Sequence, residues 1–153
     1  MALKLRRATL ADAAAIRDLT RSAYAKWVPL IGREPLPMRA DYAVAVVQHI
    51  IDVHESEGRI AALVEVIPQA SHLLIENLAV SPDLQGKGIG SLLVDHAEAI
   101  ARALHLGEVR LYTNAAFIPN IEFYGRRGFR EFHREPFPAG GVTVHMKKQI
   151  DSS

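Results

Sequence analysis

The chain has 153 residues, 49% hydrophobic and 23% charged, proportions typical of a soluble globular protein with a sizeable core. Eighteen Lys and Arg against seventeen Asp and Glu leave a net charge of +1, so the overall charge gives no reason to expect nucleic acid or an anionic membrane as partner; the alternative is a local basic patch. The absence of cysteine excludes disulfides, thiolate catalysis and cysteine-based zinc sites, and no apolar run is long enough to span a bilayer. We therefore expect one cytoplasmic domain over residues 1–153.

The N-terminal part of the chain is predicted to form a strand and two helices. Residues 3–9 have the pattern of a short strand, and Thr9 with Asp12 is a candidate capping box for the helix that follows. Three prolines and a glycine within residues 27–38 predict an irregular loop. Apolar residues then recur at helical spacing and predict a second helix, which extends to Ile50 and Ile51.

Strands dominate the middle of the chain. A hairpin turn at 55–59 separates a weak strand from stronger ones over 59–68 and 72–80. Residues 88–106 have one apolar stripe at helical spacing, and Gly107 is placed as the C-cap of that helix.

The C-terminal part is predicted to contain a strand over 108–113, a short helix over 119–128, and strands over 129–134 and 142–148. The complete order is therefore β-α-α-β-β-β-α-β-α-β-β. Such an order predicts an α/β protein with one mixed sheet and helices on both faces.

Three glycines, Gly86, Gly88 and Gly90, stand where a strand gives way to a helix. A glycine-rich loop at a helix N-terminus presents unpaired backbone N–H groups beside the positive end of the helix dipole, so it can bind phosphate or pyrophosphate. The G-x-G-x-G spacing matches neither a Walker A loop nor a dinucleotide fingerprint. The alternative is a turn whose glycines only relieve strain.

The stretch LQGKGIGSLLV resembles the acetyl-CoA loop of the GNAT superfamily of N-acetyltransferases, whose pattern is Q/R-x-x-G-x-G/A. Gln85, Gly88 and Gly90 occupy its three defining positions, and NIEFYGRRGF at 120–129 resembles the second signature of the family. The resemblance covers nearly the whole chain. It implies the GNAT fold of a bacterial-type, single-domain acetyltransferase, with acetyl-CoA as its cofactor.

In the family, the strands that match 73–80 and 108–113 splay apart, and the pantetheine arm lies between them like an added strand. By this resemblance the N–H of Val80, or of a neighbour, would hold the thioester carbonyl and the oxyanion formed there. The cofactor-binding residues implied are Leu78, Ala79, Val80, Gln85, Gly86, Lys87, Gly88, Ile89, Gly90, Ser91, Asn114, Asn120 and Tyr124.

Two residues are candidates for proton transfer. Tyr124 matches the general acid of the family, which protonates the departing thiolate; the alternative is an aromatic side chain that only packs in the core. Glu76 is the candidate base, since it lies on the strand that borders the gap. Its alternative is a carboxylate paired with Arg or Lys, and Glu122 and His72 are further candidates for the base. The seven histidines show no ligand spacing, so no metal site is expected.

The acceptor implied is a primary amine of a small molecule or peptide, acetylated directly in a ternary complex, because no nucleophile suggests a covalent intermediate. In this family the first two helices and their connection cover the acceptor side. The residues that would line it here are Tyr24, Trp27, Arg33, Met38 and Tyr42. Arg33 is expected to face an acidic group of the substrate or the solvent.

Two further expectations follow from the resemblance. Members of the family often dimerise through strand edges, so we expect VTVHMKK (142–148) to be an edge strand and the protein to be a homodimer. The alternative function is a non-catalytic acyl-CoA-binding sensor or regulatory module.

Overall fold

The computed structural model describes residues 3–151. Its sheet has the strand order β1-β2-β3-β4-β5-β7-β6, antiparallel throughout except for the parallel neighbours β4 and β5. The strands are β1 Arg6–Arg7, β2 Ile50–Ser56, β3 Arg59–Pro68, β4 Leu73–Val80, β5 Glu108–Asn114, β6 Arg130–Pro136 and β7 Val142–Gln149. The α-helices of this part of the chain are α1 Ala13–Tyr24, α2 Val28–Ile31, α3 Tyr42–Gln48, α4 Ile89–Ala103 and α5 Ile118–Arg126.

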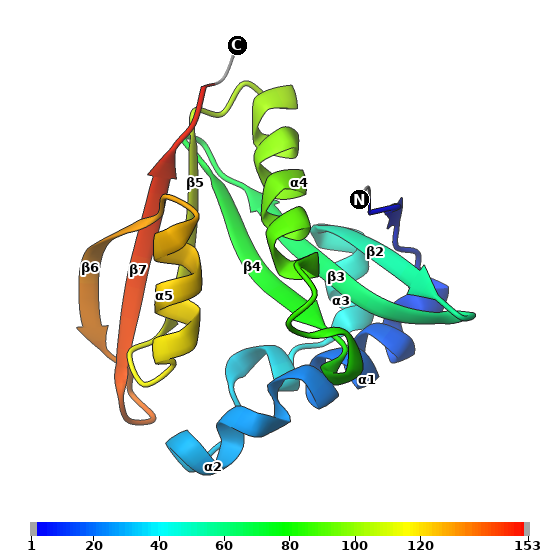
Figure 1. Cartoon of the computed structure of the whole chain (residues 1–153), viewed down its shortest axis with the longest axis horizontal. Helices are drawn as coiled ribbons and strands as arrows, with labels where there is room; N and C mark the ends of the chain where they lie inside the picture. Colours follow the sequence, from blue (N-terminus) through cyan, green and yellow to red (C-terminus); the bar gives the residue numbers. More distant parts are fainter. Residues whose placement is uncertain (1–2, 152–153) are drawn as a thin grey trace.

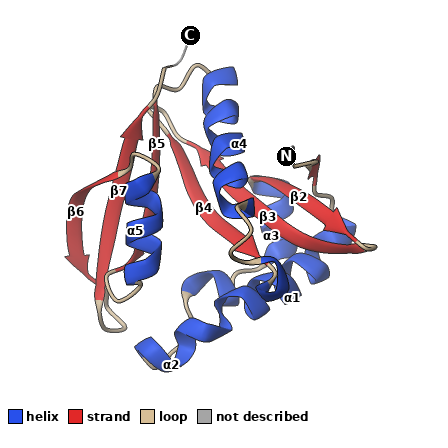
Figure 2. Ribbon diagram, in the orientation of Figure 1, coloured by secondary structure: helices blue, strands red, loops and turns tan. Residues whose placement is uncertain are grey.

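Helices cover both faces of the sheet, as predicted. Figure 1 shows α4 and α5 in front of the strands and α1 and α3 behind them, and Figure 2 shows the same layers by element type. Each face has its own apolar cluster. Leu93 and Val94 of α4 belong to the front cluster, and Ile16 and Leu19 of α1 belong to the rear one. The mixed α/β architecture is therefore confirmed.

Helix α1 starts where the sequence indicates. The chain enters it through a 3-10 turn at Leu10–Asp12, and the Thr9 N–H donates to Asp12 Oδ2 at 2.8 Å. This bond satisfies one N–H group that the helix itself cannot.

The second predicted helix is shorter than expected. Helix α3 ends at Gln48, His49 is extended (φ −116°, ψ 173°), and Ile50 and Ile51 begin β2. Two adjacent isoleucines fit a helical stripe and a buried strand equally well, so spacing could not separate the two. Pairing with β3 decides for the strand, where Ile51 is 1% exposed.

Residues 27–38 are more regular than the irregular loop predicted. They contain α2, the last residue of a 3-10 turn at Ala25–Trp27, and the start of another at Leu36–Arg39. Prolines occupy the first turns of two of these short helices, where the missing N–H breaks no intrahelical bond.

Helix α4 does not end at Gly107 as predicted. The left-handed residue is His105 (φ 59°), and the Leu106 N–H donates to Ala101 O at 2.8 Å, as in a Schellman motif. Glycine is the usual residue at such a left-handed position, so the presence of Gly107 led to a predicted helix end two residues beyond His105.

The strand predicted at the edge lies inside the sheet. β7 pairs with β5 on one side and β6 on the other, so β6 is the edge strand. Val144 and Met146 of β7 are buried, whereas every residue of β6 is exposed. The prediction that 142–148 is an edge strand is therefore wrong, and the homodimer stays a prediction.

The gap between β4 and β5 is confirmed. The two strands pair only from Leu73 opposite Val109 to Ile75 opposite Leu111, and then diverge (Figure 1). On the other side of β4, the pairing with β3 shifts by one residue, so Glu76 is the extra residue of a β-bulge. The bulge and the divergence therefore coincide, and they open the sheet at one point.

Candidate active site

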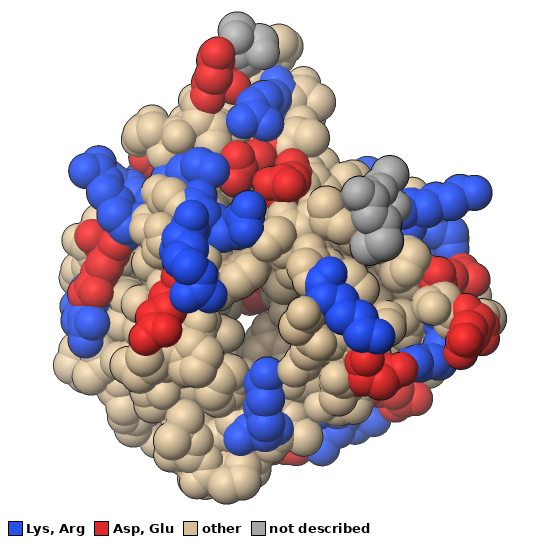
Figure 3. Space-filling model, viewed as in Figure 1, with Lys and Arg blue, Asp and Glu red and all other residues tan. Residues whose placement is uncertain are grey.

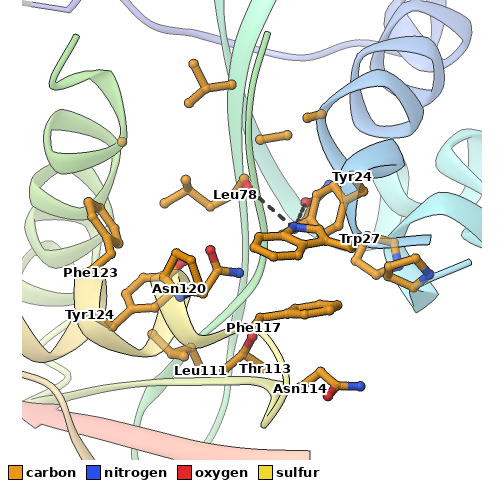
Figure 4. Close-up of a pocket in the computed structure, with 18 of the residues that line it drawn as sticks. Tyr24, Trp27, Leu78, Leu111, Thr113, Asn114, Phe117, Asn120, Phe123 and Tyr124 are labelled. Carbon is orange, nitrogen blue, oxygen red and sulfur yellow. Dashed lines mark hydrogen bonds between the residues drawn. The ribbon is translucent and has the colours of Figure 1, made fainter. Parts of the chain in front are cut away.

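The gap between β4 and β5 is the entrance to a cavity of about 650 Å³, which we call the cleft. Figure 3 shows a hollow in the middle of the molecule with Lys and Arg on several sides, and Figure 4 shows aromatic and amide side chains around it. Predicted site residues that line the cleft are Tyr24, Trp27, Arg33, Glu76, Leu78, Ala79, Val80, Gln85, Gly86, Gly88, Ile89, Gly90, Ser91, Asn114, Asn120 and Tyr124. Lys87, Met38 and Tyr42 do not line it.

The exposed edge of β4 presents backbone groups to the cleft. The Ser81 N–H donates to Ala61 O at 2.8 Å, and antiparallel pairs alternate between bonded and non-bonded, so Ala79 also faces β3. The N–H and C=O groups of Leu78 and Val80 therefore point away from β3, toward the gap.

Side chains cover the two carbonyls of this edge. The Val80 carbonyl accepts a hydrogen bond from Gln85 Nε2 at 2.9 Å, and the Tyr24 hydroxyl lies 3.4 Å from the Leu78 carbonyl (Figure 4). The same hydroxyl donates to Asn77 Oδ1 at 2.8 Å. Since the acceptors are covered, the edge offers the cleft chiefly its N–H donors, which suits an oxygen that gains negative charge.

The loop glycines serve two different purposes. Gly86 and Gly88 have φ angles of +81° and +83°, a left-handed conformation that other residues adopt with strain, and no atom would crowd a side chain there. Gly90 has no such angle, but a Cβ on it would lie 3.3 Å from Phe123 Cζ. Two glycines shape the turn, and the third allows α4 and α5 to approach.

The N-terminus of α4 is suited to an anion. Its N-cap is Gly88, no side chain caps it, and its first turn contains no acidic residue. Lys26 donates to Gln85 Oε1 at 3.0 Å and Arg126 lines the cleft, which adds positive charge near the loop. Uncapped N–H groups, the helix dipole and these cations together fit the pyrophosphate of coenzyme A.

Tyr124 extends from α5 into the cleft wall, one turn after Asn120, and both line the cleft (Figure 4). Its ring packs edge-on against Phe123 and Phe129, with centroids 5.0 and 5.7 Å away. Burial raises the pKa of Tyr124 above its ordinary value, and its hydroxyl has no hydrogen-bond partner within residues 3–151. The hydroxyl is therefore protonated at neutral pH and available to a ligand.

Glu76 lies at the fork of the two strands. The Tyr112 hydroxyl donates to Glu76 Oε1 at 2.6 Å, and no Lys or Arg of the described chain pairs with this carboxylate. Glu122 and His72, the other candidates for the base, do not line the cleft. Tyr112 was not predicted from the sequence, because only the parallel register that pairs Ile75 with Leu111 brings it next to Glu76.

The acceptor side is held by contacts across the cleft. Trp27 stacks on Phe117 with centroids 4.4 Å apart and planes at 21°. Arg33 donates to the Gly140 carbonyl at 3.3 Å and lies 4.5 Å from the Phe137 ring. Arg33 is therefore bound to the β6–β7 turn. Sequence reasoning had not selected the two phenylalanines, because only the tertiary structure brings them to this segment.

Residues 3–151 contain no group of three His, Asp or Glu side chains that could hold a metal ion. Among the helices of the same residues, none has the length and apolar character to cross a membrane.

A splayed mixed sheet with a glycine loop at a helix N-terminus defines the class of acyl-transfer enzymes that bind coenzyme A between two strands. The profile of the acetyltransferase (GNAT) family matches residues 14–129. The chain belongs to this family. Membership confirms the predictions of an N-acetyltransferase and of acetyl-CoA as its cofactor.

Individual relatives agree with this assignment. An uncharacterized N-acetyltransferase of Chlorobaculum tepidum is 31% identical over 137 residues, 88% of this chain and 79% of that protein. A streptothricin acetyltransferase of Streptomyces lavendulae is 36% identical over 76 residues, 48% of this chain and 40% of that one. The PaiA N-acetyltransferase of Thermoplasma acidophilum, solved with coenzyme A, has a TM-score of 0.80 at 19% identity, covering 97% and 99% of the two chains.

Proposed function

We propose that this enzyme transfers an acetyl group from acetyl-CoA directly to a primary amine of a small molecule or peptide, with both substrates bound at once. One observation carries the proposal. The same cleft is lined by the glycine loop, by the aromatic residues around Trp27, and by the two candidates for proton transfer, Glu76 and Tyr124. The chain has no cysteine that could carry the acetyl group as a thioester.

The donor supplies an acetyl thioester, an acyl group already activated for attack. The N–H groups of Leu78 and Val80 would hold the thioester oxygen, and the developing negative charge would strengthen these bonds. Asn120, whose side-chain amide has no hydrogen-bond partner within residues 3–151, and Asn114, which accepts from the Ala116 N–H at 2.9 Å, would bind the cofactor.

Two proton transfers complete the reaction. Glu76, directly or through one water, would take a proton from the attacking ammonium, and its bond from Tyr112 keeps the carboxylate at the fork. Tyr124 would donate its phenolic proton to the departing thiolate, because burial keeps the phenol protonated at neutral pH. The proton released by the amine and the proton accepted by the thiolate thus pass through different walls of the cleft.

An acceptor screen tests the proposal. Purified protein with acetyl-CoA is offered primary amines, amino acids and lysine peptides, and free thiol is measured. We expect thiol release with at least one amine, and an N-acetylated product by mass spectrometry. Binding of acetyl-CoA without turnover or hydrolysis would instead support the non-catalytic sensor. The organisation of residues 1–153 as one catalytic domain and a cytoplasmic location belong to the same proposal.

A further inference from the structure

We infer that the acceptor amine carries a second cationic group, and that this group binds in a smaller cavity beside the cleft. The class of acceptor is then an aliphatic diamine or a longer polyamine. The inference rests on the proposed function, because it concerns the substrate of that same site.

The smaller cavity, which we call the side cavity, has a volume of about 320 Å³. It lies between α3 and strands β3 and β4, and four of its lining residues also line the cleft: Leu36, Pro37, Glu76 and Asn77. The two spaces therefore meet at the wall that carries the candidate base. A linear acceptor with its reacting amine beside Glu76 has the side cavity as a neighbouring space to extend into.

Glu65 is the buried charge of the side cavity. Its side chain is 4% exposed, and on β3 it stands opposite Asn77, the residue that follows the bulge. Oε2 of Glu65 lies 2.6 Å from Nδ1 of His49. The other oxygen, Oε1, has no hydrogen-bond partner in the described part of the chain, and the residue lines the cavity. A buried carboxylate with one oxygen unbonded is suited to a charged hydrogen-bond donor.

The charges around the side cavity favour a cation. Three carboxylates line it, those of Asp41, Glu65 and Glu76, and its lining includes no Lys or Arg. Asp41 is already used in part, because its Oδ1 accepts from the Ala43 and Val44 N–H groups at the start of α3. His49 is the single basic side chain in the lining. An ammonium group would compensate this excess of negative charge, whereas a carboxylate or phosphate would add to it.

Chain geometry agrees with an aliphatic connection. The residues shared by the two cavities include the apolar Leu36 and Pro37, which offer apolar contact to a methylene chain that extends from the cleft into the side cavity. The reacting amine must lose a proton, but the second amine keeps its charge throughout. A permanent charge that leaves water needs a paired carboxylate, and Glu65 supplies one.

The first experiment compares two acceptors of equal length, butylamine and 1,4-diaminobutane, by thiol release with saturating acetyl-CoA. Charge-assisted hydrogen bonds to a buried carboxylate correspond to roughly a ten- to hundredfold preference, so we expect kcat/KM to be higher by about that factor for the diamine. Equal values for the two amines would overturn the inference and leave the proposed function intact. If no amine of any kind causes thiol release, the proposed function itself is contradicted.

The second experiment places a positive charge at the side cavity without changing any buried residue of the protein. Val44 and Val47 are exposed residues of α3, 46% and 76% exposed, and of the two only Val44 lines the side cavity. We expect Val44→Lys to raise the KM for the diamine about tenfold and to leave that for butylamine unchanged. Val47→Lys is the matched control and should change neither. Equal effects of the two variants would contradict a cation site.

Glu65→Gln tests the carboxylate directly. We expect the preference for the diamine over butylamine to fall at least tenfold, with acetyl-CoA affinity retained. Asp95→Asn, which removes one charge from an exposed position of α4, is the control. A melting curve shows whether Glu65→Gln folds. If the variant does not fold, the two valine variants decide between the outcomes.

Titration of 1,4-diaminobutane against Trp27 fluorescence, with coenzyme A present, gives a binding readout independent of turnover. An equal loss of activity toward both amines would assign Glu65 to holding His49 alone.

Discussion

The two sides of the cleft are built in different ways. The cofactor side consists of the end of β4, the glycine loop and the start of α4, which are contiguous from residues 78 to 91, together with one helix, α5. It offers the proposed donor mostly backbone N–H groups, which the left-handed glycines and the uncapped start of α4 leave accessible. The acceptor side is formed by side chains of residues 23–49 and of the β6–β7 turn, with Glu65 of β3 behind them.

This difference explains why a sequence motif identifies the donor substrate but not the acceptor. A backbone site requires particular dihedral angles, which glycines at fixed spacing encode locally, so one short motif identifies the donor. A side-chain site requires that distant segments meet, as Trp27 and Phe117 do, so no short motif identifies the acceptor. The donor side is accordingly a property of the family, and the acceptor side is a property of this chain.

The largest expected effect concerns Tyr124, the side chain proposed for catalysis on the cofactor side. Tyr124→Phe removes the proton and little volume, so we expect kcat to fall roughly 10²–10⁴-fold, as for loss of a general acid, with acetyl-CoA affinity nearly unchanged. Tyr24→Phe is the matched control on the opposite wall, and its effect should be smaller. A near-normal rate for Tyr124→Phe, with chemistry rate-limiting, would mean that the thiolate leaves without help from this residue.

The next effect tests whether backbone conformation binds the donor. Gly88→Glu forces a side chain into a left-handed position (φ +83°) and adds a negative charge at the anion site. We expect acetyl-CoA affinity, measured by calorimetry, to fall roughly a hundredfold or more, because like charges cost several kcal/mol. Gly125→Glu, at a helical position of α5 with open space around it, is the control. Unchanged affinity in a folded Gly88→Glu variant would show that the loop does not contact the cofactor.

A smaller effect is expected at the fork of the strands, where the two sides meet. Tyr112→Phe removes the hydrogen bond to Glu76, and a bond to a charged group of this kind corresponds to roughly a tenfold change. We expect kcat/KM for the acceptor to fall by about that factor while acetyl-CoA affinity stays the same. If both fall together, Tyr112 supports the sheet and has no separate effect on the acceptor side.

The smallest effect is expected at Asp12, which lines neither side of the cleft, so its variant shows how a change in stability alone affects the enzyme. The Arg6 guanidinium beside Asp12 holds the pKa of that carboxyl at about 2, below its ordinary value. Because the folded pKa is depressed, the stabilisation is complete at neutral pH and is lost as the pH falls from about 4 toward 2. We expect Asp12→Asn to lower the free energy of unfolding at pH 7 by roughly 1 kcal/mol, and by less at pH 3.

Thermal melts at the two pH values measure this difference, with Asp18→Asn, an exposed position of the helix that follows, as the control. Catalytic constants of Asp12→Asn should match those of the wild type. A destabilisation equal at both pH values would mean that the charge of Asp12 contributes nothing and that only its shape matters.

The fold could be predicted where one periodicity or one cap dominated. The strand over residues 59–68, the stripe of α4 and the start of α1 at Thr9 were of this kind. The prediction was wrong where two structures satisfied the same local pattern, as at Ile50 and Ile51, which fit a helix or a strand. It was also wrong for the edge strand, because pairing on both sides of β7 is a long-range fact that alternation along one strand does not contain.

By itself, the sequence determined the family and the fold class, and it singled out the loop that we propose binds the donor. Those properties depend on dihedral angles and spacings within a few residues, at Gln85, Gly88 and Gly90 and around Asn120 and Tyr124. Only the tertiary structure decided the surroundings of the acceptor. It placed the bulge and the strand divergence at one residue, stacked two aromatic rings across the cleft, and buried a carboxylate in a cavity beside the candidate base. The physical reason is that these contacts join segments far apart in the chain, so their energy depends on packing rather than on neighbouring residues.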